Sequence, residues 1–283
     1  MKQGINIEYV QFKRNAKETR SLQEAISLCK NAGFLDFDYL SSWNCDDYIK
    51  VAKQARELFD TNGCVVHQSH CPFFRYKQDG IALFKQAAPS AVEIAGILGA
   101  KYLVLHADEW PEKGIDYNCT LVAPKTYEIM APIVELCAKY GVFPAFENLF
   151  DESARKDDNG RTRFSAKSED LLELLERFGK ENVGICLDTG HAYVSYKENV
   201  LDLVKCLAPY IVCTHIHDNK SSDDLHQPAF AGTLPIENVF TILKQNGYQG
   251  NLTWEMVYGR YPDELLPDFL ALLHKSGEYL STF

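Results

Sequence analysis

Short apolar runs alternate with longer segments of helical spacing along the whole chain, and this alternation restricts the fold more than any other feature of the sequence. The expected strands are residues 4–9, 34–40, 64–68, 101–105, 142–146, 183–187, 210–214 and 252–254. The expected helices are residues 21–32, 46–59, 80–98, 124–140, 168–178, 198–207, 236–245 and 264–279, with a kink or break at Pro89. Eight strand–helix repeats without a linker predict one α/β domain over residues 1–283, a (β/α)8 TIM barrel.

Motifs for nucleotide cofactors are absent from the sequence. An open, doubly wound sheet usually has fewer strands and a glycine-rich phosphate loop after the first of them. Neither G-x-G-x-x-G nor G-x-x-x-x-G-K-[ST] occurs in this chain. The barrel is therefore the better interpretation, and a nucleotide cofactor is not expected.

Composition restricts the partners and the compartment. The formal net charge of −10 argues against nucleic acid and anionic membranes, although a local basic patch would not show in this total. The nine cysteines are odd in number and contain no Cys-x-x-Cys pair, which favours a reducing compartment over a disulfide framework. The N-terminus does not resemble a signal peptide, and no run reaches 18 apolar residues. We expect a soluble cytoplasmic protein.

Residues that can bind metals or move protons follow the expected strands at one end. They are His70 or His67, His106, Glu147, Asp188, His217 and Glu255, at or just past the ends of strands three to eight. In a TIM barrel these ends converge on one mouth, where active sites are built. Of the eight histidines, only His274 lies within an expected helix away from this rim. The pattern predicts a site at the C-terminal ends of the strands.

Mixed nitrogen and oxygen ligands suit a borderline divalent ion such as Zn²⁺, Mn²⁺ or Co²⁺ rather than Mg²⁺. A core of four ligands can be drawn from strands five to eight: Glu147, Asp188, His217 and Glu255. The remaining candidates, for further ions or for substrate contacts, are His70, His106, His191, Asp224 and His226. One to three ions per chain are compatible with this set.

Some of these residues also have ordinary structural interpretations. His67 and His215 precede the better candidates His70 and His217, so each is expected to pack or to form hydrogen bonds rather than to bind metal. His70 and His106 are also candidates for contacts with substrate alone, and Trp110 for the pocket wall.

The motifs resemble those of the xylose-isomerase-like barrel superfamily, which includes sugar isomerases and epimerases and the endonuclease IV enzymes of DNA repair. The resemblance covers almost the whole chain. It is carried by His70-Cys-Pro-Phe, Leu105-His106, Phe146-Glu147-Asn148, Leu187-Asp188-Thr-Gly-His191, His215-Ile-His217-Asp-Asn, Asp224-Leu-His226 and Thr253-Trp254-Glu255.

Two ligand sets are implied by this resemblance. In the isomerases and epimerases, one ion would be held by the counterparts of Glu147, Asp188, His217 and Glu255. In endonuclease IV three zinc ions are held by nine ligands, whose counterparts are these four together with His70, His106, His191, Asp224 and His226. The net charge and the loop Cys71-Pro72-Phe73-Phe74, which lacks the duplex-wedging residues of endonuclease IV, favour the sugar enzymes.

The sequence therefore predicts a metal-dependent isomerase or epimerase for a small sugar or sugar phosphate. Glu147 and Glu255 would exchange a proton with the carbon next to a carbonyl, through an enediolate. The expected substrate contacts are His191, His106, His70 and Trp110. The alternative is an endonuclease IV-like zinc phosphodiesterase that acts on abasic DNA. The sequence is compatible with a homo-oligomer and does not fix the number of subunits.

Overall fold

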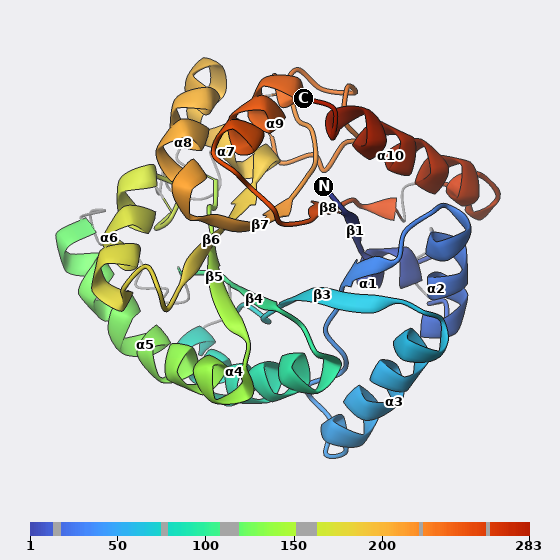
Figure 1. Ribbon diagram of the computed structural model, residues 1–283. Helices are drawn as coiled ribbons and strands as arrows, with labels where there is room; N and C mark the ends of the chain where they lie inside the picture. Colours follow the sequence, from blue (N-terminus) through green and yellow to red (C-terminus); the bar gives the residue numbers. More distant parts are fainter. Residues whose placement is uncertain (14–17, 75–78, 108–118, 151–162, 221–222, 259–260) are drawn as a thin grey trace.

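Eight parallel strands form a nearly closed barrel in the computed structural model (Figure 1). The structure describes residues 1–13, 18–74, 79–107, 119–150, 163–220, 223–258 and 261–283. The strands are β1 (Gln3–Asn6), β2 (Asp36–Asp38), β3 (Val65–His70), β4 (Tyr102–Leu105), β5 (Phe143–Glu147), β6 (Gly184–Asp188), β7 (Ile211–His215) and β8 (Leu252–Trp254). Their order in the sheet is β7-β6-β5-β4-β3-β2-β1-β8, so the predicted TIM barrel is confirmed.

The barrel closes between β7 and β8 just past the last regular residue of β7. The backbone N–H of Ile216 donates to the carbonyl of Thr253 at 2.7 Å, and the N–H of Glu255 donates to the carbonyl of Ile216 at 3.2 Å. Ile216 and Trp254 form a parallel bridge at this point. This closure brings the end of β8 beside the ends of β6 and β7.

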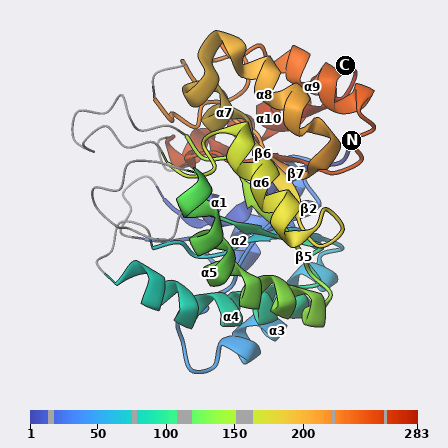
Figure 2. The same ribbon diagram turned by 90° about the vertical axis from the view of Figure 1, so that its left-hand side faces the viewer.

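Helices surround the sheet and run alongside it (Figures 1 and 2). They are α1 (Ile7–Gln11), α2 (Leu22–Asn31), α3 (Tyr48–Thr61), α4 (Gly80–Leu98), α5 (Cys119–Tyr140), α6 (Ser168–Phe178), α7 (Thr189–Tyr196), α8 (Val200–Leu207), α9 (Ile236–Gln245) and α10 (Leu266–Leu280). In the described part of the chain, three short 3-10 segments accompany them: η1 (Lys197–Asn199), η2 (Ala208–Tyr210) and η4 (Asp263–Leu265). Most boundaries lie within a few residues of those expected.

Three expectations about secondary structure were wrong. The first strand ends at Asn6 rather than at residue 9, because the Asn6 side chain caps α1 by accepting the N–H of Tyr9 at 3.4 Å. The expected break at Pro89 does not occur, since α4 continues through this residue, while the alternative of a kink stays a prediction. The short helix α7 was not expected; its first turn carries His191, and Asp188 is its N-cap.

The core has two layers, as a barrel requires. Inside the barrel lies a small cluster of Tyr102, Val104, Ala145, Cys186 and Cys213. A much larger apolar cluster fills the space between the sheet and the helices. The strands are buried on both faces, which explains why they read as continuous apolar runs rather than as alternating ones.

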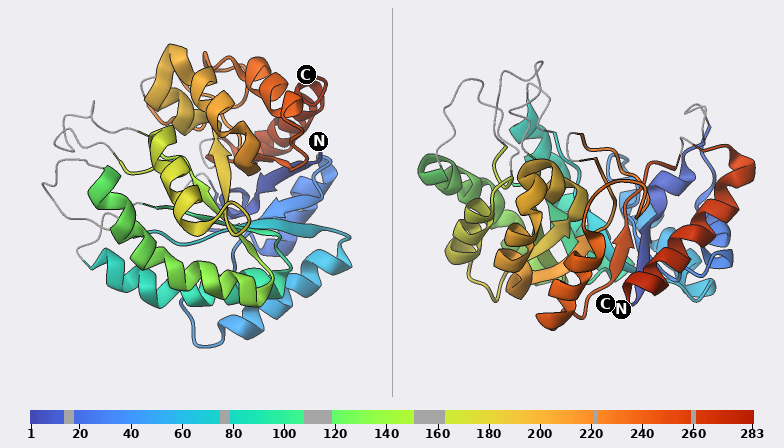
Figure 3. Two further views of the ribbon diagram at one scale, coloured as in Figure 1. Left: turned by 60° about the vertical axis from the view of Figure 1, so that its left-hand side comes forward. Right: turned by 90° about the horizontal axis from the view of Figure 1, so that it is seen from above.

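Helix α4 has the length and apolar composition of a membrane span, and 44% of its apolar 18-residue stretch is buried inside the protein. It contacts α3, α5, β3 and β4 as one of the outer helices of the barrel, and this packing accounts for its apolar residues. The N- and C-termini lie near each other at one end of the barrel (Figure 3). Because the chain enters β1 there, the C-terminal ends of the strands lie at the opposite end.

Candidate metal centre

The ligand-type residues predicted from the sequence converge at the C-terminal mouth of the barrel. His70, Glu147, Asp188 and His215 are the last residues of β3, β5, β6 and β7, while His106 and Glu255 directly follow β4 and β8. Asp188 and His215 are paired across β6 and β7, so these two side chains lie at the same level. The parallel sheet thus brings residues from distant parts of the sequence to one place.

Glu147, Asp188, His215 and Glu255 form the deepest cluster, called the core cluster below. Each offers a ligand atom, and these atoms all lie within 4.8 Å of one another. The Nδ1 atom of His215 lies 3.5 Å from Glu147 Oε1 and 3.4 Å from Glu255 Oε2. This nitrogen is buried and has no hydrogen-bond partner among the described residues. Two glutamates, an aspartate and an imidazole nitrogen are a donor set that suits a divalent ion.

The opposite side of the His215 ring is held by Asp38, at the end of β2. His215 Nε2 lies 3.0 Å from Asp38 Oδ2, and the Gln68 amide donates to the same oxygen at 3.2 Å. Thr253 Oγ1 in turn donates to Gln68 Oε1 at 3.1 Å. A carboxylate that orients an imidazole in this way is typical of metal-binding histidines. Sequence analysis missed Asp38, because the second strand was expected to run to residue 40, whereas it ends at Asp38.

A second cluster consists of His70, His106 and Glu147. The Nε2 atoms of both histidines lie 3.2 Å from Glu147 Oε2, so this glutamate is shared with the core cluster. The ring of Phe73 stacks on that of His106, with centroids 4.4 Å apart, and covers it toward the mouth. Both histidines therefore lie where the sequence predicted them.

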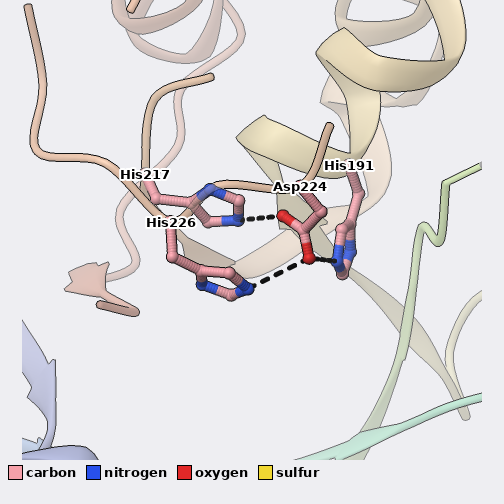
Figure 4. Close-up of side chains that lie close together, drawn as sticks. All are labelled: His191, His217, Asp224 and His226. Atoms are coloured by element: carbon pink, nitrogen blue, oxygen red, sulfur yellow. Dashed lines mark hydrogen bonds and ion pairs between the residues drawn. The ribbon is translucent and has the colours of Figure 1, made fainter. Parts of the chain in front are cut away.

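A third cluster surrounds Asp224, with three imidazoles directed at its carboxylate (Figure 4). Asp224 Oδ2 lies 3.1 Å from His226 Nε2 and 3.5 Å from His191 Nε2. Asp224 Oδ1 lies 3.8 Å from His217 Nε2. The rings of His217 and His226 are stacked, with centroids 4.1 Å apart.

The sequence assigned His217 to the core and left His215 as a packing residue, whereas the structure groups them the other way round. Strand β7 ends at His215, level with Asp188. Side chains two residues apart point to the same side but lie about 6.6 Å apart along a strand. His217 therefore reaches the third cluster, although its Nε2 remains 3.0 Å from Asp188 Oδ1. Gly190 leaves room for its ring, which a Cβ at that position would overlap.

Asn148 and Asp188 connect the core cluster to α7. The Asn148 side chain accepts the N–H of Asp188 and donates to the Asp188 carbonyl, both at 2.8 Å. Asp188 Oδ1 accepts the N–H of His191 at 2.7 Å and so caps the helix. His191 Nδ1 lies 3.0 Å from the Asn148 carbonyl. His191 is therefore held between two strand ends. The expected contact residue Trp110 lies outside the described residues.

The carboxyl and imidazole groups of the clusters shift each other's pKa. Burial alone would raise the pKa of the Glu147 carboxyl, but the imidazoles of His215, His106 and His191 hold it well below its usual range. Burial lowers the pKa of His70, while its contact with Glu147 more than compensates and raises it to about 9. In the metal-free protein Glu147 thus stays ionised beside a protonated His70. A bound cation would have to displace this proton.

Glu8, on α1, is a further carboxyl group in the cavity that sequence analysis missed. Its Oε1 accepts the N–H of Leu40 at 2.8 Å, and the side chain lines the cavity in front of the clusters. Burial and the negative charge of Asp38 raise its pKa to about 7, against the opposing effects of Leu40 and His70. Glu8 is therefore largely protonated below neutral pH.

This raised pKa predicts a pH-dependent gain in stability for Glu8→Gln in the metal-free protein. The unfolded chain releases the Glu8 proton near pH 4.5 and the folded protein near pH 7, so the wild type loses stability between these values. We expect the variant to be more stable at pH 8 by roughly 3 kcal/mol, with little difference at pH 4.5. Urea unfolding at several pH values measures this, with the exposed Glu57→Gln as the control. An equal effect at both ends of the range would contradict it.

Comparison with known proteins is decisive for the family. The family model described as "Xylose isomerase-like TIM barrel" matches residues 24–275. The chain belongs to this family. The inosose isomerase of Halalkalibacterium halodurans is 21% identical over 258 residues, which cover 86% of each protein.

Solved structures with the same fold superpose over the full length of this chain. A D-tagatose 3-epimerase-like protein has a TM-score of 0.75 and 22% identity, and covers 100% of this chain and 98% of its own. The IOLI protein with a bound zinc atom has a TM-score of 0.75 and 16% identity, with the same coverage. At these identities the likeness shows the shared fold.

Proposed function

We propose that this protein is a divalent-metal-dependent isomerase or epimerase that acts on a small sugar or sugar derivative. The observation that carries the proposal is the core cluster, in which carboxylate oxygens of Glu147 and Glu255 lie 3.5 and 3.4 Å from His215 Nδ1. Binding a sugar does not require two such carboxylates, whereas moving a proton between faces of a carbon does. The names of the inosose isomerase and of the epimerase-like structure support the same class of reaction.

The core cluster fits a divalent ion. Its buried imidazole nitrogen has no partner among the described residues, and three carboxylates converge on it. We propose Glu147, Asp188, His215 and Glu255 as its ligands, with Zn²⁺, Mn²⁺ or Co²⁺ as the ion. Such an ion supplies Lewis acidity, which polarises a carbonyl and stabilises the enediolate form of the substrate. The zinc atom named for the IOLI protein supports a metal in this family.

In the proposed mechanism the side chains move and hold protons. One of the two glutamates, Glu147 or Glu255, removes the proton from the carbon next to the carbonyl, and the other returns a proton to the same or the opposite face. His191, fixed by Asn148, holds a substrate hydroxyl. The Phe73 ring shields His106 and limits the entry of water from that side. Trp110 stays a proposed contact on the basis of the sequence alone.

A substrate panel tests the proposal directly. The protein is prepared metal-free, loaded separately with Zn²⁺, Mn²⁺ and Co²⁺, and incubated with ketoses, inosose and inositol derivatives and sugar phosphates in deuterated water. We expect turnover with at least one ion and incorporation of deuterium at the carbon next to the carbonyl. Turnover without exchange in any metal form, or no turnover on the whole panel, would contradict an enolisation mechanism.

Phosphodiester hydrolysis on abasic DNA is the second candidate. It is favoured by the presence of three clusters of ligand-type residues, the number that an enzyme with three zinc ions requires. The net charge of −10 opposes it. An abasic oligonucleotide belongs in the same panel, together with elemental analysis. Three zinc ions per chain and cleavage of the oligonucleotide would favour the hydrolase, and one ion per chain the isomerase.

We also propose that the protein works in the cytoplasm. The eight cysteines whose side chains are described are free thiols, and six of them are buried. Buried thiols without disulfides suit a reducing compartment.

A further inference from the structure

The cavity at the barrel mouth is larger than the reaction proposed above requires. Its volume is about 750 Å³, within the range of pockets that enclose drug-sized ligands. The ligand-type residues of the clusters form one part of its lining. The segments that follow β1 and β2 form another part, called the second half below, which includes Phe12, Thr19, Trp43 and Asn44. A single sugar ring beside Glu147 would occupy only part of a cavity of this volume.

Four aromatic residues of the lining belong to the second half: Tyr9, Phe12, Tyr39 and Trp43. Phe12 is 48% exposed. Its ring lies 6.5 Å from that of Tyr9, which also lines the cavity. The Trp43 ring meets Phe74 edge-on at 5.6 Å, so its position is fixed by packing. Exposed aromatic faces in a cavity wall are suited to stacking against the apolar face of a ligand ring.

This wall is held in place from behind by a buried arginine. Arg20 is 8% exposed, and its Nη1 donates to the carbonyls of Val10 and Phe12 at 3.0 and 3.2 Å. Its Nη2 forms an ion pair with Asp263 at 2.6 Å. Phe12 and Thr19 also form an antiparallel bridge. The aromatic surface is therefore preformed, which lowers the entropic cost of binding.

The charge of the second half points to a neutral ligand. Among the described residues that line the cavity, Arg163 is the one lysine or arginine. Its guanidinium lies 5.2 Å from the centre of the Phe150 ring, on the side of β5, away from the segments after β1 and β2. Among the described polar groups in the second half, Gln11, Thr19 and Asn44 are uncharged, and the one carboxyl group, Glu8, would repel a phosphate when ionised. They suit hydroxyl groups rather than a phosphate.

Building on the proposed function, we propose that the half of the cavity formed by Phe12 and Trp43 is a subsite for a second, uncharged sugar ring. The substrate is then of disaccharide size. Its carbonyl-bearing unit lies at Glu147 and Glu255, and its second ring stacks on the aromatic wall. Binding of this ring positions the reacting unit through contacts remote from the chemistry.

Binding of unreactive alditols tests the subsite without relying on turnover. We expect maltitol, which carries a glucosyl ring on glucitol, to bind the metal-loaded protein at least about tenfold more tightly than glucitol in calorimetric titrations. Trp43→Ala and Phe12→Ala should remove most of this difference and leave the affinity for glucitol unchanged. Phe230→Ala is the matched control, because Phe230 is 51% exposed and packs on Tyr279 outside the cavity lining. Thermal unfolding of each variant verifies that it folds.

The outcomes separate this inference from the proposed function. Equal affinities for the two alditols in the wild type, including no binding of either, would overturn the subsite, as would equal losses for both ligands in the variants. Turnover of monosaccharides with the same kcat/KM as their glucosylated forms would overturn it too, while the isomerase proposal would stand. A maltitol preference that depends on Trp43, without turnover of any sugar, would support the subsite and refute the proposed reaction.

Discussion

Glu147→Gln and Glu255→Gln are each expected to lower kcat by about 10²- to 10⁴-fold on whichever sugar the protein converts. Each change removes a carboxylate that the proposed mechanism uses for proton transfer, while the side chain keeps its shape. Glu147 is also shared with His70 and His106, so its loss is expected to disturb the second cluster as well. Steady-state kinetics measures turnover, and exchange of the substrate proton with deuterated water measures the removal of that proton.

Elemental analysis must accompany these kinetics, because both residues are also proposed ligands. Glutamine keeps one oxygen donor, and we expect a weakened but measurable affinity that excess metal ion can saturate. The exposed Glu57→Gln serves as the control for expression and for the assay. If both site variants retained wild-type turnover when loaded with metal, the isomerase mechanism would be refuted.

His215→Asn is expected to remove the core ion, and with it nearly all activity, whereas His217→Asn is expected to leave that ion in place. The reason is geometric, since His215 Nδ1 lies within 3.5 Å of two glutamate oxygens, while His217 Nε2 lies near Asp188 and Asp224. Removing one of four ligands costs more than removing a supporting residue, which typically lowers affinity 10- to 100-fold. We therefore expect a loss above about 100-fold for His215→Asn.

In the same experiment, Asp38→Asn tests a residue that orients the His215 ring but is not itself a proposed metal ligand. It preserves the shape of the side chain that holds His215 Nε2, and removes its charge. We expect about a 10- to 100-fold fall in affinity for the core ion, with activity restored at high metal concentration. Metal titration of the four proteins gives the order of affinities. A larger loss for His217→Asn than for His215→Asn would restore the assignment made from the sequence.

Most of the residues in the clusters could be found from the sequence because each directly ends a strand. Glu147, Asp188 and Glu255 follow apolar runs that are buried on both faces, and such runs are easy to recognise. The expected end of the first strand was wrong, because residues 7–9 have the side-chain pattern of a strand but form α1, whose N-cap is Asn6.

The supporting residues carry weaker signals. Asp38 belongs to Asp36-Phe37-Asp38, where alternating acidic residues look like the solvated face of a strand. Glu8 lies between Ile7 and Tyr9, in a stretch that was expected to continue the first strand. Asn148 directly follows Glu147, which was the ligand candidate at the end of the fifth strand. Each becomes meaningful only through a partner far away in the sequence: Asp38 through His215, and Glu8 through Leu40.

The sequence alone determined the barrel and the end of it that carries the ligand-type residues. Both follow from the spacing of apolar residues and from the residue types at the end of each apolar run. Only the tertiary structure decided how those residues are shared among clusters. His215 and His217 stand two residues apart in the same motif. What separates them is the pairing of β6 with β7 and the closure by β8, which place the side chain of one near Glu147 and Glu255 and that of the other beside Asp224.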